Sequence, residues 1–142
     1  MSGSIRVFAN KKKIKLDINL RKINLVKFNQ FKKRVNLIIN RIKKFTKQYK
    51  FVVGIGAATK GNTLLNCCQF SDKDISMILD KSKFKINKFT PGSGIRIVDE
   101  NIKINPDAAV ILPWNITKYL LKRRIFKKKI KYISIPKIIN KL

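Results

Sequence analysis

The stretch VGIGAATKGNTLLN, residues 53–66, decides the fold of this chain. It continues a short apolar run, residues 51–55, of the kind found in buried strands. Glycines follow, and then a segment over about 60–70 that we expect to be a helix. A strand that passes through a tight glycine turn into a helix is typical of layered α/β domains.

The rest of the chain continues this alternation. Apolar residues spaced three or four apart predict a long amphipathic helix over 28–49, with one face formed by Phe28, Phe31, Val35, Ile38, Ile42 and Phe45. Further apolar runs predict strands over 75–79, 95–98, 108–112 and 132–135. A third helix is predicted from 114 or 115 to about 126. The pattern predicts an α/β fold with a mostly parallel sheet.

Composition leaves the chemical class of the partner open. A chain of 142 residues that is 44% apolar is long enough for one domain with a real core. The net charge of +27 favours nucleic acid or another polyanion as a ligand. Lysine far outnumbers arginine, however, and nucleic-acid readers use arginine for bidentate contacts. We therefore assign much of the charge to solvated faces, and expect most aromatic residues in the core.

Several classes of protein are disfavoured by what the sequence lacks. No apolar run approaches the roughly 18 residues that a membrane span needs, and the N-terminus has no apolar core of a signal peptide. The adjacent Cys67 and Cys68 make a poor disulfide pair, and no histidine is present to complete a metal site with them. We expect a cytoplasmic protein with no membrane partner and no bound metal.

Three polar segments follow predicted strands: 54–62, 80–88 and 113–115. Because ligands of parallel sheets bind at the carboxyl ends of the strands, these segments should meet at one site. In the first, Gly56 allows close approach of the backbone, Gly61 and Asn62 begin a helix that favours anions, and Lys60 adds a positive charge. The spacing matches neither standard phosphate-loop motif, so an ordinary strand-to-helix turn is the alternative.

Other candidates have equally plain alternatives. Asp80 could accept hydrogen bonds from ribose hydroxyls, or it could cap a helix or pair with nearby lysines. Trp114 could stack on a base or a sugar, or it could belong to the core. Asn115 could bind the ligand or cap the following helix.

A complete catalytic centre is not expected on this chain. It contains no histidine, which is the commonest general base, and only 7 acidic residues. Ser82 and Ser93 therefore have no histidine to activate them. We assign no catalytic residue.

Four segments, in order, resemble the C-terminal domain of SAM-dependent sugar C-methyltransferases, which methylate a carbon of nucleotide-linked deoxysugars. Residues 56–66 (GAATKGNTLLN) resemble the family's GAPAKGNTLLN signature, and residues 80–93 resemble its D-R-N-x-x-K-x-x-R-Y-x-P-G-T segment. Residues 106–115 (PDAAVILPWN) are similar to PDYVLILPWN, and residues 3–8 (GSIRVF) to GSLRVY. Ile135 and Pro136 match the family's closing strand.

The resemblance implies a Rossmann-like three-layer sandwich over 28–142. Residues 1–27 would be the last strand (4–8) of a preceding methyltransferase domain and a linker. Ala58, Cys67 and Ser82 replace a proline, an aromatic residue and an asparagine of the family, which affects the geometry of the ligand site more than the fold.

The resemblance also implies that this chain binds substrate but does not catalyse methyl transfer by itself. The chain would bind a nucleotide-diphospho-sugar through Gly56, Lys60, Gly61, Asn62, Asp80, Trp114 and Asn115. S-adenosylmethionine would bind a separate methyltransferase polypeptide, because the family's zinc-binding and SAM-binding domains have no counterpart here. The alternatives are a basic binding or scaffold protein for nucleic acid or an acidic partner, and a gene remnant without activity.

Overall fold

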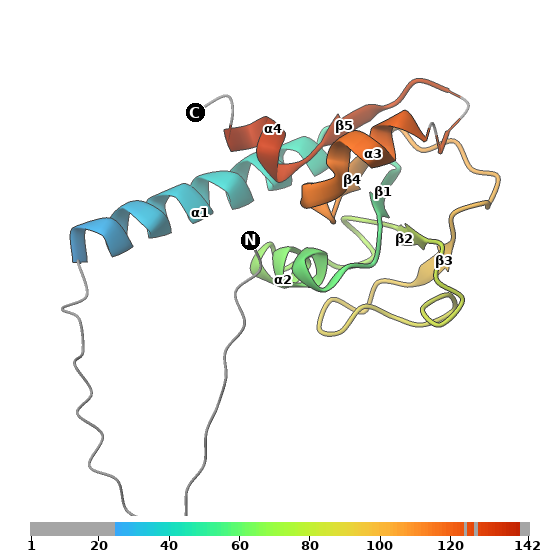
Figure 1. The fold of residues 1–142 in the computed structure, drawn as a ribbon, viewed down its shortest axis with the longest axis horizontal. Coiled ribbons are helices and arrows are strands. Elements are labelled where there is room, and N and C mark those ends of the chain that lie inside the picture. Colours follow the sequence, from blue (N-terminus) through green and yellow to red (C-terminus); the bar gives the residue numbers. More distant parts are fainter. Residues whose placement is uncertain (1–24, 124, 127, 140–142) are drawn as a thin grey trace, which may run out of the picture.

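The computed structural model describes residues 25–139 except 124 and 127 (Figure 1). The strand predicted over 4–8 and most of the predicted linker lie outside the described residues. The proposed division of the chain at residue 27 therefore stays a prediction.

The centre of the fold is a five-stranded sheet in which every neighbouring pair of strands is parallel. The strands are β1 (Val52–Ile55), β2 (Met77–Asp80), β3 (Ile97–Asp99), β4 (Ala108–Ile111) and β5 (Lys131–Ile133). Their order across the sheet is β3-β2-β1-β4-β5. The predicted α/β fold is confirmed, and the sheet is parallel throughout.

Helices cover both faces of the sheet. They are α1 (Leu25–Thr46), α2 (Thr59–Cys67), α3 (Thr117–Lys122), which follows the 3-10 helix η1 (Trp114–Ile116), and α4 (Ile135–Ile139). Val52 of β1 packs in one buried cluster with residues of α1, α2 and α4, whereas the next residue, Val53, packs in another with Leu120 of α3. Because successive side chains of a strand point to opposite faces, the fold has three layers.

Element boundaries differ from the predicted ones mainly near the C-terminus. The strand predicted over 132–135 ends at Ile133, and Ile135 and Pro136 instead begin α4, which the sequence analysis missed. Proline fits there because the first turn of a helix needs no donor from its backbone nitrogen. The helix predicted from 114 to about 126 is a short 3-10 helix followed by α3, which ends at Lys122.

The apolar face predicted for α1 is only partly buried. Ile42 is buried and Ile38 packs against the core, as expected. Phe28 and Phe31, which continue the same face, are 56% and 64% exposed, so their prediction as core residues was wrong. Figure 1 shows the reason: the first turns of α1 extend beyond the sheet, where no described element covers them.

The two cysteines at the end of α2 differ in exposure: Cys67 is exposed and Cys68 is buried. Burial raises the pKa of the Cys68 thiol from 9.0 to about 11, an effect that the nearby Lys43 opposes. At pH 8 we expect a thiol reagent to modify Cys67 in the native protein and Cys68 only after unfolding, because the reactive species is the thiolate. Equal rates for both thiols would contradict this burial.

The same shift makes stability fall at high pH. Between pH 9.0 and about 11 the native Cys68 keeps its proton while the unfolded chain releases it. The free energy of unfolding should therefore decrease across that window, and a Cys68→Ala variant should lose this part of the pH dependence. Chemical denaturation at several pH values measures the difference.

The strand order creates the place where a ligand site is expected. The chain leaves β1 and β4, which are neighbours, toward opposite faces of the sheet: α2 follows β1 and packs on one face, and α3 follows β4 and packs on the other. In open α/β sheets, ligands bind outside the carboxyl ends of two such neighbouring strands, where the connections change from one face of the sheet to the other.

Candidate functional site

The turn after β1 needs glycine at position 56. Gly56 has φ +82°, and a Cβ atom there would lie 2.7 Å from the ring of Pro113, which follows β4. The Gly56 nitrogen donates to the carbonyl of Leu79 in the neighbouring strand β2, at 2.7 Å. The turn is thus pressed against the ends of both strands that flank β1.

Asp80, the last residue of β2, braces this turn. Its Oδ2 atom accepts a hydrogen bond from the Ala57 nitrogen at 2.6 Å, and its Oδ1 atom accepts one from the Ser82 nitrogen at 2.8 Å. The Lys85 ammonium lies 3.8 Å from Oδ2 and donates to the Ala57 carbonyl at 2.8 Å. Asp80 therefore pairs with a nearby lysine, which is one of the alternatives to a ribose contact that the sequence offered. A hydrogen bond from Asp80 to a ribose stays a prediction.

The start of α2 leaves backbone donors available. Ala58 is the N-cap residue and makes no side-chain hydrogen bond to cap the helix, and the first turn contains no acidic residue. Gly61 is buried against Leu112, and a Cβ atom at this position would lie 2.4 Å from the Cβ of Leu112. Lys60 is exposed beside them. An anion approaching this end of α2 would meet free N–H groups and one cation.

Two pockets, each of about 280 Å³, flank the glycine turn. The first, here the Asn62 pocket, lies between the start of α2 and the segment 85–91, and includes Asn62, Leu65, Lys85, Lys88, Phe89 and Leu112. The second, here the Asp80 pocket, lies on the side of α3 and includes Gly56, Asp80, Lys81, Pro113, Tyr119 and Arg123. Ala58 and Lys85 line both, so the two pockets share a wall.

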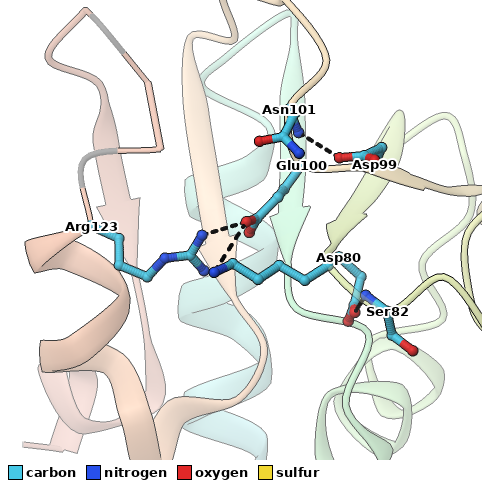
Figure 2. A network of polar contacts seen from close by, with 7 residues as sticks. Asp80, Ser82, Asp99, Glu100, Asn101 and Arg123 are labelled. Carbon is cyan, nitrogen blue, oxygen red and sulfur yellow. Dashed lines mark hydrogen bonds and ion pairs between the residues drawn. The ribbon is translucent and has the colours of Figure 1, made fainter.

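A network of charges closes one side of the Asp80 pocket (Figure 2). The Glu100 carboxylate, whose side chain is 8% exposed, accepts a hydrogen bond from Arg123 and lies 3.7 Å from the Lys81 ammonium. The hydrogen bond to Glu100 raises the pKa of Arg123 above its ordinary value. Arg123 also lies 6.0 Å from the centre of the Tyr119 ring. The three cations that line this pocket, Lys81, Lys85 and Arg123, are therefore all paired with carboxylates.

The segment 85–91 is fastened to α2 by Asn66. Its side-chain nitrogen donates to the carbonyl oxygens of Asn62, at 2.9 Å, and Pro91, at 3.0 Å. Gly92, with φ +80°, allows the chain to pass so close that a Cβ atom would lie 2.1 Å from the Asn66 amide oxygen. Asn66 thus holds Pro91, which lines the Asn62 pocket, close to α2.

The predicted site residues are only partly brought together. Gly56 and Asp80 line one pocket and Asn62 lines the other, whereas Lys60, Gly61, Trp114 and Asn115 line neither of the two. Trp114 packs partly buried against the core, and Asn115 is exposed. A ligand contact by Trp114 or Asn115 stays a prediction.

Some residues of the site were missed by the sequence analysis. Glu100 and Arg123 are 23 positions apart and no motif connects them, so only the fold shows that they pair. Lys85, Lys88 and Phe89 lay in a matched segment but received no role, although all three line the Asn62 pocket. Their position after Asp80, at a strand end, was the available signal.

The described part of the chain contains no cluster of three or more metal-ligating side chains, and none of its helices is long and apolar enough to cross a bilayer.

Comparison with known proteins identifies the domain. A protein-family model described as "C-methyltransferase C-terminal domain" matches residues 2–136, nearly the whole chain. A search of curated proteins finds no significant match. The matched range contains the glycine turn, Asp80, both pockets and all five strands. This chain therefore belongs to the family of C-methyltransferase C-terminal domains.

Proposed function

We propose that this chain is the substrate-binding part of a SAM-dependent sugar C-methyltransferase, and that it binds a nucleotide-linked sugar at the carboxyl edge of its sheet. The methyl donor would bind a methyltransferase domain other than this one. The observation that carries the proposal is the pair of pockets that flank the glycine turn. They lie at the carboxyl ends of β1 and β4, from which the chain leaves toward opposite faces of the sheet, in a domain that belongs to this family.

The charges at this edge suit a diphosphate. Lys60 is exposed beside the uncapped start of α2, and Lys88 is exposed at the Asn62 pocket. Lysine side chains and free helix N–H groups together attract phosphate oxygens. The ligand's diphosphate would lie across the start of α2, with the groups at its two ends directed into the pockets.

The same edge fits S-adenosylmethionine poorly. S-adenosylmethionine carries a sulfonium cation, a net positive charge and no phosphate, so free helix N–H groups and lysines that suit a diphosphate disfavour it. Lys60 and Lys88 are both exposed at this edge and would repel such a cation. We therefore assign S-adenosylmethionine to a different domain and expect no binding of it by this chain alone.

Calorimetric titration tests the proposal directly. UDP-glucose and dTDP-glucose should give saturable heat, and Lys60→Ala should weaken binding by about tenfold, because a hydrogen bond to a charged group is lost. Lys47→Ala, which removes an exposed lysine that follows α1 and lines neither pocket, is the matched control. No heat at millimolar nucleotide-sugar, with the fold intact, would refute the proposal.

A second candidate function is that of a basic binding or scaffold protein for nucleic acid or an acidic partner, which would bind along α1. This helix carries lysine or arginine at 27, 32, 33, 34, 41, 43 and 44 and has no acidic residue. A polyanion bound along it would release counterions, so its affinity would fall steeply with salt. Nucleotide-sugar binding should depend only weakly on salt and should not change when Lys33 and Lys44 are replaced by alanine.

A further inference from the structure

The Asn62 side chain has an unsatisfied acceptor. Its Oδ1 atom is shielded from water, and no described residue donates a hydrogen bond to it. A buried acceptor without a partner costs about 1–3 kcal/mol, and such groups in native proteins call for an explanation. Asn62 lines the Asn62 pocket, so a rotation of its side chain would bring this acceptor to a donor group of a ligand in that pocket.

The other walls of this pocket are mostly apolar. Leu65 and Leu112 are buried and form part of its lining, and the Thr90 hydroxyl is already bonded to Ser93 and Ile95. Phe89 lines the pocket with 62% of its surface exposed. An exposed aromatic ring beside an apolar pocket is suited to stacking against a flat ring.

The size and polarity of the pocket decide which part of the ligand fits. Its volume of about 280 Å³ is below the usual range for a whole drug-sized ligand, about 300–1,000 Å³, so one ring system fits better than a complete nucleotide-sugar. A sugar ring carries several hydroxyls, each of which needs a partner when buried. An asparagine amide presents a donor and an acceptor side by side, as the edge of a nucleobase does.

We propose that the Asn62 pocket seats the nucleobase of the ligand, with the Asn62 amide bonded to the edge of the base and Phe89 stacked on its face. Lys88, at the same pocket, then lies toward the diphosphate. This assignment rests on the proposed function, and it gives the base a seat separate from the Asp80 pocket, which is left for the sugar.

Titrations with ligands that share the diphosphate but differ in the base test this assignment. The probes are UDP, ADP and inorganic pyrophosphate, and the variants are Asn62→Ala and Phe89→Ala. Each variant should weaken UDP and ADP by about tenfold, the size expected for one hydrogen bond or one stacked base. Binding of pyrophosphate should not change.

Matched controls separate the pocket from the surrounding surface. Phe84→Ala removes a phenylalanine that is 86% exposed, directly precedes the segment 85–91 and is not part of the pocket lining. Asn40→Ala removes an exposed asparagine on α1. Both controls should bind UDP as the parent protein does. Thermal unfolding checks that each variant is folded, and Phe89→Ala, at an exposed site, remains informative even if Asn62→Ala is unstable.

The outcomes distinguish the two proposals. Binding of UDP-glucose that is unchanged in both variants would overturn the assignment of the base and leave the proposed function standing. Equal losses for UDP and pyrophosphate would also overturn it, because the pocket would then hold the diphosphate. Absence of binding by every nucleotide and nucleotide-sugar would refute both.

Discussion

Replacing Gly56 by alanine is expected to lower the free energy of unfolding by about 3 kcal/mol. The left-handed backbone at φ +82° costs a non-glycine residue about 1–2 kcal/mol. The new methyl group would also lie 2.7 Å from the Pro113 ring, which is rigid, and such overpacking adds about 1–3 kcal/mol. Urea denaturation measures the loss as a lower midpoint with an unchanged slope.

Gly94 provides the control for this prediction. It also has a positive φ, +65°, but a Cβ atom there would meet nothing within 4 Å. Gly94→Ala should therefore cost only the backbone strain, about 1 kcal/mol. If Gly56→Ala and Gly94→Ala destabilised the protein equally, the contact between the glycine turn and Pro113 would not be the constraint described here.

Replacing Asp80 by alanine is expected to cost about 2–3 kcal/mol. The change leaves the backbone nitrogens of Ala57 and Ser82 without their acceptor and Lys85 without its counter-charge. Each unsatisfied donor that is shielded from water costs about 1–3 kcal/mol. The Asp80 side chain is only 13% exposed, so water replaces these contacts poorly. Urea denaturation again measures the effect.

Two further variants give this prediction its contrast. Asp80→Asn keeps one acceptor oxygen and should cost less than Asp80→Ala, whereas Asp72→Ala, at an exposed position, should be close to neutral. A neutral Asp80→Ala would contradict the bracing role. In Asp80→Ala we expect both the free energy of unfolding and the affinity for a nucleotide-sugar to fall, because Asp80 holds the turn that separates the two pockets.

The glycine turn and its strand could be predicted from sequence because local chemistry determines them. Gly56 has a positive φ, a conformation that favours glycine, so the residue itself indicates the turn. The apolar run before it is continuous because both faces of the strand are buried. The position of Asp80 at the end of β2 followed from the same pattern. These are short-range features, visible within a dozen residues.

What could not be predicted depends on contacts between distant segments. Phe28 has the correct spacing for a core face, but only the fold shows that α1 extends beyond the sheet. The pairing of Glu100 with Arg123 joins a loop to the end of α3, and neither residue has a local signal. The separation of the site into two pockets depends on where Lys85 and Ala58 lie in three dimensions.

The most direct test of the central claim is to map nucleotide-sugar binding residue by residue with amide chemical shifts. Titration with UDP-glucose should move the signals of 56–62 and 85–91 at the carboxyl edge of the sheet, and leave those of α1 unchanged. Shifts spread along α1, or no shifts at millimolar ligand in a folded protein, would contradict the account.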